Sequence, residues 1–284
     1  FGLIDSSNFS MRYIIIYTTM KPFLKWPGNK YRLVKYIKKV LPSGKRLVEP
    51  FVGSGSVFLN TDYKSYLLCD INKDLIDVYQ TLKTYKHEFI AYCKSFFTEK
   101  NNSKEKYYEL RELFNKTEDK VLKSALFVYL NRHGYNGLVR YNSRGEFNTP
   151  FGRYEKPYFP EKEMRFFIEK CEKSEVEFKC QDFRDTFKQI KEGDVVYCDP
   201  PYIPLSDTAN FTSYSKEGFS MEDQKTLGSL AKYYSNKGIP VIISNHYDEK
   251  IVNIYDTLII SLQVRRSISC KERKKVNELI AVFK

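Results

Sequence analysis

A charge-free apolar run leads directly into Asp199-Pro200-Pro201-Tyr202, and this junction constrains the fold more than any other segment. The run, residues 195–198, is short and rich in valine, which predicts a buried parallel strand. Asp199 then stands at the carboxyl end of that strand, where open α/β sheets bind ligands. Successive prolines cannot continue a strand ladder, and Pro200 pushes Asp199 into an extended conformation. The sequence therefore predicts a stiff turn that presents a carboxylate, a free carbonyl and an aromatic ring.

This combination suits methylation of an amino group on a nucleobase. Such a nitrogen is a poor nucleophile, and acceptors such as an ionised Asp199 and the Pro200 carbonyl can orient its N–H bonds. Tyr202 can stack on a base that has left the duplex. A donor such as S-adenosylmethionine (AdoMet) requires alignment in line at roughly 3 Å, but no metal and no covalent nucleophile. The plainer alternative is that Asp199 caps a turn and Tyr202 is a half-buried aromatic.

Composition favours a nucleic-acid partner. The 284 residues include 47 Lys and Arg against 35 Asp and Glu, a formal charge of +12, and 16% of them are aromatic. An excess of cations with many aromatics is typical of nucleic-acid binding, although a solvated basic surface is the alternative. The length suits one core plus an insertion. The oligomeric state is open, with a monomer as the working expectation.

Cysteine and histidine spacing gives no sign of a metal site. The six cysteines include no C-x-x-C pair, and the three histidines are dispersed. This pattern favours reduced thiols in a cytoplasmic protein, without bound metal. No stretch approaches the roughly 20 apolar residues of a membrane span. Residues 1–19 are interpreted as a leader of uncertain role, and Met20 is a possible natural start.

A second candidate site follows the apolar run at residues 47–52, which ends in Gly53-Ser54-Gly55-Ser56. The next apolar run ends at Asp70. A strand, a glycine turn and a later acidic residue are similar to the opening of a Rossmann-like unit, in which the acid accepts from ribose hydroxyls. Phe58 stands where a third glycine is required for a dinucleotide, so a cofactor without a pyrophosphate, such as AdoMet, fits better. A simple tight loop is the alternative.

Hydrophobic periodicity divides the rest of the chain. Residues 72–131 show apolar positions at helical spacing, and strand character recurs at 176–180, 195–199, 241–245, 258–264 and 278–283. We expect an α/β fold: a Rossmann-like AdoMet-dependent methyltransferase sheet with an inserted, mainly helical target-recognition domain. The catalytic AdoMet-binding domain is expected at 20–72 and 161–284, and the DNA target-recognition domain at 73–160.

The insertion ends in a polar, glycine-rich segment at residues 131–142, which we interpret as a recognition loop rather than core. Arg pairs with guanine, Asn pairs with adenine, and Tyr or Leu can wedge into a base stack. The alternative is a surface loop whose asparagines only satisfy turns.

Several long segments resemble one family. They are FLKWPGNKY (23–31), LVEPFVGSGSVFLNTDY (47–63), DINKDLI (70–76), YLNRHGYNGLVRYNSRGEFNTPFGRYEKPYFP (129–160), VVYCDPPYIPLS (195–206), NFTSY (210–214) and VRRSIS (264–269). From residue 22 to 284 the chain resembles the Dam-type DNA adenine-N6 methyltransferases, which recognise GATC in double-stranded DNA and flip the adenine. The chain departs from the family at Pro27 and Asn29, where some members have smaller residues. It also departs at residues 270–273, where the stretch is shorter than a glycine-rich loop in some relatives.

The resemblance implies roles for individual residues. Those contacting AdoMet would be Trp26, Lys30, Gly53, Gly55, Asp70 and Asp199, with Asp182 and Phe183 at its adenine. The catalytic turn would be Asp199, Pro200 and Tyr202. Residues that read or intercalate into the target would be Lys25, Tyr135, Asn136, Leu138, Arg140, Pro150 and Tyr154. Phosphate or positioning contacts would be Asn142, Asn148 and Arg153.

Three other functions compete with this interpretation. Cytosine-N4 methylation needs the same acceptors. A DNA-binding relative without catalysis would share the basic charge and the recognition loop, but it would require a damaged cofactor pocket. A nicotinamide oxidoreductase would share the glycine turn, but the missing third glycine and the Asp199 turn argue against it.

Overall fold

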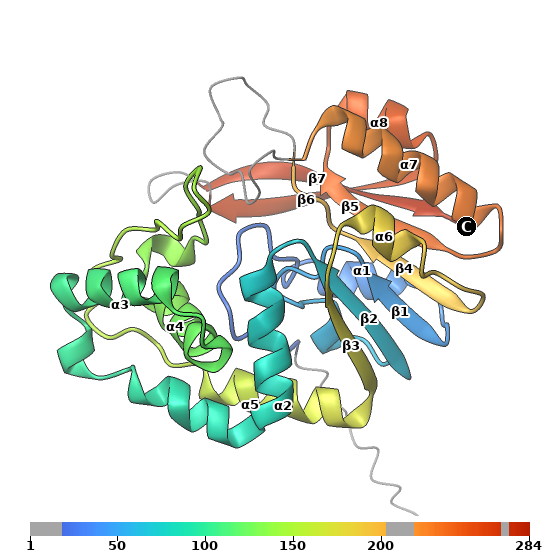
Figure 1. Cartoon of the computed structure of the whole chain (residues 1–284). Coiled ribbons are helices and arrows are strands. Elements are labelled where there is room, and N and C mark those ends of the chain that lie inside the picture. The colour runs from blue at the N-terminus through green and yellow to red at the C-terminus, as the bar shows by residue number, and fades with distance from the viewer. Residues whose placement is uncertain (1–18, 203–218, 268–272) are drawn as a thin grey trace, which may run out of the picture.

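A single mixed sheet organises the chain, as the computed structural model shows for residues 19–202, 219–267 and 273–284 (Figure 1). Its strand order is β3-β2-β1-β4-β5-β7-β6. The strands are β1 (Arg46–Glu49), β2 (Ser65–Asp70), β3 (Glu175–Cys180), β4 (Asp194–Cys198), β5 (Val241–His246), β6 (Leu258–Ser267) and β7 (Arg273–Phe283). The first five run parallel, whereas β7 is antiparallel to both β5 and β6.

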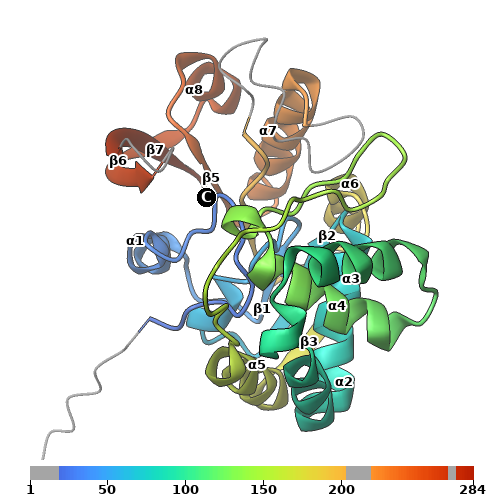
Figure 2. The ribbon, with the colours of Figure 1, turned by 90° about the vertical axis from the view of Figure 1, so that its left-hand side faces the viewer.

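Helices cover both faces of the sheet. They are α1 (Val34–Val40), α2 (Lys73–Ser95), α3 (Lys104–Lys116), α4 (Lys120–His133), α5 (Glu161–Lys173), α6 (Phe183–Phe187), α7 (Met221–Ser235) and α8 (Glu249–Tyr255). Short 3₁₀ turns are η1 (Phe58–Asn60), η2 (Glu99–Asn101) and η3 (Tyr135–Gly137). Figure 2 shows α7 and α8 on the opposite side of the sheet from α2 and α5. The expected α/β class is confirmed.

The central strands are apolar because they contribute side chains to two hydrophobic clusters, one on each face of the sheet. In β4, Val195 and Tyr197 pack with α1, α2 and α5, while Val196 and Cys198 pack with α6, α7 and α8. A strand buried on both faces needs apolar residues at every position, not at alternate ones. The strands predicted from these runs are confirmed, and so are the helices predicted within residues 72–131.

The strand order creates the site of interest. Strand β1 pairs with β2 on one side and with β4 on the other, so the order reverses between β1 and β4. In open parallel sheets, ligands bind outside the carboxyl ends of the strands at such a reversal. Here Glu49 ends β1, Asp70 ends β2, and Asp199 follows β4. Three acidic side chains distant in sequence thus stand at one edge of the sheet.

Residues 73–160 contain α2, α3 and α4, but α2 is shared with the sheet. Its Leu75 and Tyr79 belong to the same hydrophobic cluster as Tyr66 of β2 and Phe178 of β3. In Figure 1, α3 and α4 lie on the other side of the molecule from α7 and α8. The division at residue 73 between a catalytic and a recognition part stays a proposal about function.

One expectation is corrected at the end of α4. Asn131, Arg132 and His133 were expected to open an exposed loop, yet all three are buried in the last turn of this helix. Asn131 bonds the backbone of Lys25, and Arg132 donates to the carbonyl of Phe23. The His133 ring bonds the Tyr129 carbonyl within its own helix. The polar composition therefore wrongly predicted an exposed loop, because a polar side chain can be buried when it is hydrogen-bonded.

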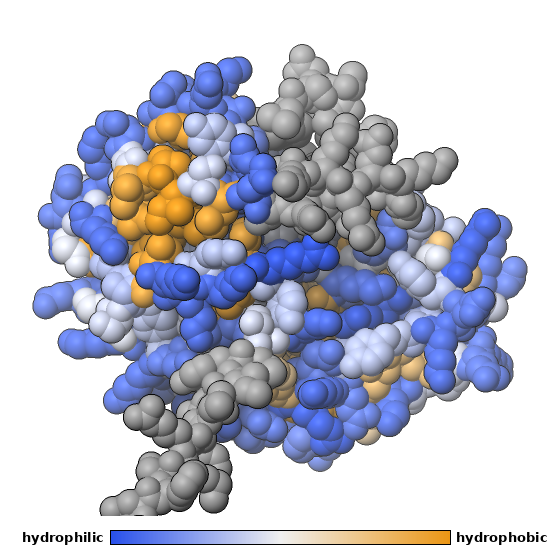
Figure 3. Space-filling model, turned by 180° about the vertical axis from the view of Figure 1, so that it is seen from behind, coloured by the Kyte–Doolittle hydropathy of each residue, from blue (hydrophilic) through white to orange (hydrophobic). Residues whose placement is uncertain are grey.

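The back of the molecule carries an apolar area over the sheet end that holds β6 and β7 (Figure 3). Leu258 is 64% exposed there, and Ile260 and Leu262 are partly buried against the α1 side of the core. In the described ranges, no helix is both long and apolar enough to cross a membrane. Residues 1–18 of the predicted leader lie outside the described residues. So do residues 203–206, the NFTSY segment and residues 268–272.

Candidate active site

The Asp199 turn is built around a buried ion pair. Lys30 Nζ lies 2.5 Å from Asp199 Oδ1 and also donates to the Gly28 carbonyl at 2.9 Å. The Lys30 side chain is only 4% exposed, and that of Asp199 is 20% exposed. Burial alone would lower the pKa of Lys30, but Asp199, Tyr202 and Glu278 outweigh this effect and raise it. The lysine therefore stays charged, and its charge stabilises the ionised form of Asp199.

Tyr202 is held at both its ring and its hydroxyl group. The Lys30 ammonium lies 5.0 Å from the ring centroid, a cation–π arrangement. The hydroxyl donates to Glu278 Oε2 of β7 at 2.7 Å, and the ring lies 5.2 Å from that of His246. The ring expected to stack on the target base is thus positioned next to the Lys30–Asp199 pair.

A buried amide network supports the turn from behind. Gln224 of α7 donates to the Pro201 carbonyl at 3.5 Å. Its own carbonyl accepts from Tyr255 of α8 at 2.6 Å and from Asn245 of β5 at 3.3 Å. Three elements thus position one proline carbonyl. Neither Gln224 nor Glu278 could be predicted from the sequence, because neither lies in a recognisable motif.

The glycine turn forms a second part of the site, beside the first. Gly53 (φ +45°) and Gly55 (φ +71°) are left-handed, which explains the choice of glycine. A Cβ on Gly53 would lie 3.1 Å from Trp26 Nε1, so Trp26 covers this turn directly. The Gly53 N–H donates to Asp70 Oδ2 at 3.0 Å. The structure therefore brings Trp26, Gly53 and Asp70 together, as three of the residues proposed for AdoMet.

Asp70 is poised to change its charge near neutral pH. Burial raises its pKa to about 6, although backbone hydrogen bonds from Asn72, Gly53 and Ile71 oppose the shift. The Asn72 N–H donates to Oδ1 at 3.0 Å. The remaining lone pairs suit the two neighbouring hydroxyls of a ribose, which is the role the glycine turn predicted.

Asp182 and Phe183 follow β3 at the same edge of the sheet. The Asp182 carboxylate accepts from the Arg184 N–H at 2.8 Å and caps α6. Phe183 is buried and stacks on Phe51 with ring centroids 5.4 Å apart. Because Phe51 follows β1, the stacking places Phe183 close to the carboxyl end of that strand. The proposed contact of Asp182 and Phe183 with an adenine stays a prediction.

Glu49 was missed by the sequence reading. It is the last residue of β1, is 2% exposed, and its Oε1 has no hydrogen-bond partner among the residues that the structure describes. Burial, reinforced by the charge of Asp199, raises the pKa of Glu49 well above its usual range against a backbone hydrogen bond from Phe58. The available signal was an acid placed just before the glycine turn, inside an apolar run.

On the DNA side, three proposed residues lie together. Lys25 Nζ lies 4.3 Å from the Tyr154 ring centroid, and the Tyr154 hydroxyl accepts from the Asn136 N–H at 3.0 Å. Burial, and then the charge of Arg132, lower the pKa of Lys25. Tyr135 is 47% exposed, and its N–H donates to the carbonyl of the exposed Pro150 at 2.8 Å. One loop thus carries Lys25 toward the recognition segment, Trp26 to the glycine turn and Lys30 to Asp199.

The remaining recognition residues are held within their own loop. Arg140 donates from Nε to Asn148 Oδ1 at 2.7 Å and from a terminal nitrogen to the Asn148 carbonyl at 3.1 Å. Asn142 Oδ1 accepts from two N–H groups of its own turn, those of Arg144 and Glu146. Its turn-forming role is therefore visible, and its phosphate contact stays a prediction. Leu138 is half-buried and Arg153 is exposed with φ +55°.

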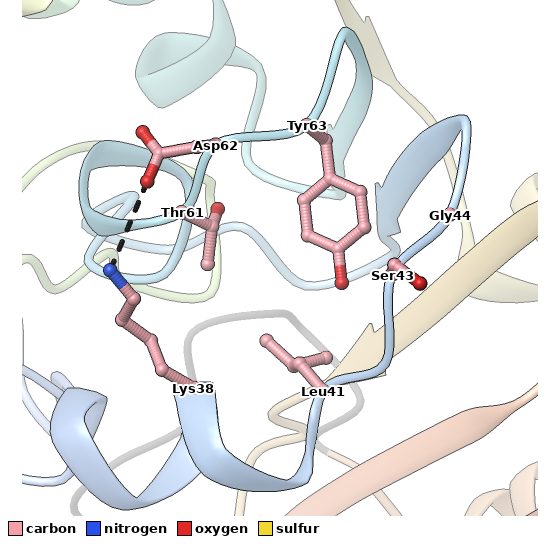
Figure 4. Close-up of a pocket in the computed structure, with 7 residues that line it drawn as sticks. All are labelled: Lys38, Leu41, Ser43, Gly44, Thr61, Asp62 and Tyr63. Carbon is pink, nitrogen blue, oxygen red and sulfur yellow. Dashed lines mark ion pairs between the residues drawn. The ribbon is translucent and has the colours of Figure 1, made fainter.

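A small cavity at the opposite edge of the sheet does not belong to this site. The cavity has a volume of about 190 Å³ and lies near the amino ends of β1 and β2. Figure 4 shows the residues that line it: Lys38, Leu41, Ser43, Gly44, Thr61, Asp62 and Tyr63. Its ion pair, Lys38–Asp62 at 4.0 Å, involves a carboxylate that is 82% exposed. Such a pair is weak, and nothing in the lining points to a bound ligand.

The fold and the site define an α/β enzyme with a small-molecule site at the β1/β4 reversal and an Asp-Pro-Pro-Tyr turn beside it. The sequence model of the family described as D12 class N6 adenine-specific DNA methyltransferase matches residues 26–268. The chain belongs to this family.

Curated relatives agree with the family. DNA adenine methylase of Escherichia coli (strain K12) is 49% identical over 267 residues, which cover 93% of this chain and 95% of that protein. The DNA adenine methylase of Serratia marcescens is 49% identical, covering 93% and 98%. That of Vibrio cholerae serotype O1 (strain ATCC 39541 / Classical Ogawa 395 / O395) is 48% identical, covering 93% and 96%. The predicted adenine-N6 DNA methyltransferase is confirmed, which argues against the cytosine-N4 and oxidoreductase alternatives, and a methyltransferase family implies AdoMet as donor.

Proposed function

We propose that this chain transfers a methyl group from AdoMet to N6 of an adenine extruded from double-stranded DNA, within GATC. The observation that carries the proposal is the Lys30–Asp199 pair beside Tyr202, at the carboxyl end of β4 and next to the glycine turn. The described residues fit AdoMet by their chemistry: a glycine turn covered by an indole, with a carboxylate whose lone pairs suit ribose hydroxyls. When bound, AdoMet supplies an electrophilic methyl group.

The chain's own residues orient the acceptor nitrogen. Asp199 and the Pro200 carbonyl accept hydrogen bonds from the two N6–H groups. These bonds orient the nitrogen lone pair toward the methyl donor. The Lys30 charge favours the ionised form of Asp199, and its hydrogen bond fixes one carboxylate oxygen. Tyr202 supplies the stacking face for the extruded base. Trp26, Gly53 and Asp70 hold the cofactor at the adjoining strand ends.

The recognition segment supplies sequence selectivity. Arg140 is oriented by Asn148 and is proposed to read guanine, and the exposed Tyr135 and half-buried Leu138 are proposed to enter the space that the base vacates. The net charge of +12 supports binding to phosphates. For a chain that acts on DNA in this way we expect a cytoplasmic location with the nucleoid, and a monomer is the working expectation.

A direct test uses labelled AdoMet with duplexes that contain GATC or a scrambled site. We expect label on adenine N6 in the GATC duplex and at most background label in the scrambled one. Equal labelling of both duplexes would contradict the proposed site, and label on cytosine would contradict the proposed product. Calorimetry of AdoMet binding in the same preparation tests the remaining alternative, a DNA-binding relative without catalysis.

A further inference from the structure

Glu278 reaches the catalytic turn from a strand outside every recognised motif. It lies on β7, which is hydrogen-bonded to β5 and β6 on its two sides: Glu278 pairs with His246 in one ladder and with Leu262 in the other. Both ladders fix its backbone, and its residue surface is 2% exposed. The carboxylate therefore has a fixed place at the carboxyl end of β5, next to the Asp199 turn.

Burying this carboxylate requires compensation. An ionised carboxylate without partners is costly in the interior, so it is tolerated only where hydrogen bonds and opposite charge offset the desolvation. Both are present, because the Tyr202 hydroxyl donates to Oε2 at 2.7 Å and Glu278 contributes to the raised pKa of Lys30. Lys30 is thus stabilised by two carboxylates, by Asp199 through a direct ion pair and by Glu278 through its charge.

We propose that Glu278 is a positioning residue that fixes the Tyr202 ring as the stacking wall for the extruded adenine; this rests on the proposed function. A tyrosine ring moves about two side-chain torsions. A hydrogen bond to the hydroxyl restricts the first torsion, which decides where the ring lies. The ring contacts with Lys30 and His246 limit rotation about the second. The position of the Tyr202 ring then depends on β7 as well as on the turn. Removing the acceptor should leave Asp199 and the cofactor residues in place but let the ring turn away from the base.

The first experiment compares Glu278→Gln with Glu278→Ala in the full chain. Glutamine keeps a carbonyl acceptor for the Tyr202 hydroxyl, whereas alanine removes it. The readouts are kcat and KM on a GATC duplex, AdoMet affinity by calorimetry, and fluorescence of 2-aminopurine at the target adenine, which rises when the base is extruded. Asn277→Ala, an exposed neighbour on β7, is the matched control.

We expect Glu278→Ala to lower kcat about tenfold and to weaken the 2-aminopurine signal, with AdoMet affinity within about threefold of wild type. Glu278→Gln should retain most of both properties. Tyr202→Phe should reproduce the alanine variant, and adding Glu278→Ala to Tyr202→Phe should cost little more, since the two groups act through one bond. Asn277→Ala should match wild type.

Additive effects of Tyr202→Phe and Glu278→Ala, or an unchanged 2-aminopurine signal in Glu278→Ala, would overturn the assignment. If the alanine variant does not fold, Tyr202→Phe and Glu278→Gln still decide it, since a phenylalanine variant with normal kcat and normal extrusion would overturn it too. A wild-type protein that neither extrudes nor methylates the adenine would contradict the proposed function itself. A fully active wild type with an equally active Glu278→Ala variant would contradict only the role of Glu278.

Discussion

The Asp199 turn and the recognition segment at residues 135–154 are stabilised in opposite ways. The turn is held by buried groups from distant elements: Lys30 before α1, Gln224 on α7 and Glu278 on β7. In the recognition segment, the side chains of Arg140 and Asn142 bond within the segment, to Asn148 and to the Asn142 turn. Distant residues such as Tyr107 and Asn115 bond mainly its backbone. Chemistry requires fixed geometry, whereas reading DNA requires side chains that can leave their resting partners for bases. Substitutions in the two regions should therefore impair different properties of the protein.

The largest effect is expected from Asp199→Ala. Removing the acceptor should abolish methyl transfer, a loss of at least about 10³-fold in kcat, while duplex affinity changes little. It also leaves Lys30 buried without its partner, so Asp199→Asn provides a version with less loss of packing. Single-turnover methylation and fluorescence anisotropy on the same duplex measure the two properties. A variant that transfers at near wild-type rate would refute the role of Asp199.

The next effect is expected on stability, from Asn131→Ala. This fully buried side chain bonds both the N–H and the carbonyl of Lys25, at 2.8 and 2.7 Å. Leaving those groups unsatisfied should lower the free energy of unfolding by about 2–3 kcal/mol. Urea denaturation measures it, and Asn142→Ala is the matched control, expected to cost about 1 kcal/mol or less. Equal losses would show that buried bonds to a distant segment contribute no more to stability than bonds within the recognition segment.

A smaller effect of a different kind is expected from Arg140→Ala. Discrimination at the guanine it reads should fall by about 1–3 kcal/mol, while the free energy of unfolding changes by about 0.5 kcal/mol or less. Competition between GATC and singly substituted duplexes measures the first, and urea denaturation the second. Unchanged discrimination would remove Arg140 from the reading contacts.

The smallest effect is expected from pH, through Asp70. Its pKa of about 6 in the folded protein means that the carboxylate is mostly ionised at pH 7 and mostly protonated at pH 5. If the ionised form accepts from ribose hydroxyls, AdoMet affinity should fall about tenfold between these values. The empty protein should show the opposite trend in stability: because folding raises this pKa, the contribution of Asp70 is present below about pH 4 and is lost as pH rises through 6.

Calorimetry at several pH values compares wild type with Asp70→Asn. The variant should bind AdoMet weakly and with a flat pH profile. A tenfold pH dependence that survives in Asp70→Asn would assign the titration to another group.

The strands and helices could be predicted because their signals are local. Valine-rich runs such as residues 195–198 indicate burial on both faces, and the prolines after Asp199 end the strand by themselves. The glycine turn was visible for the same reason, since Gly53 and Gly55 adopt conformations that other residues rarely adopt. The polar end of α4 was predicted wrongly, because composition does not show which backbone groups Asn131 and Arg132 will satisfy.

By itself, then, the sequence determined the α/β class, the order of the elements, the Asp199 turn and, through resemblance, the family. Only the tertiary structure decided the partners: Glu278 lies 76 residues from Tyr202, and Asn131 lies 106 residues from Lys25. Periodicity reports which face of a strand or helix is buried, but it does not report what packs there. A buried polar group acquires its partner only when the chain brings distant segments together, as it does at the Asp199 turn.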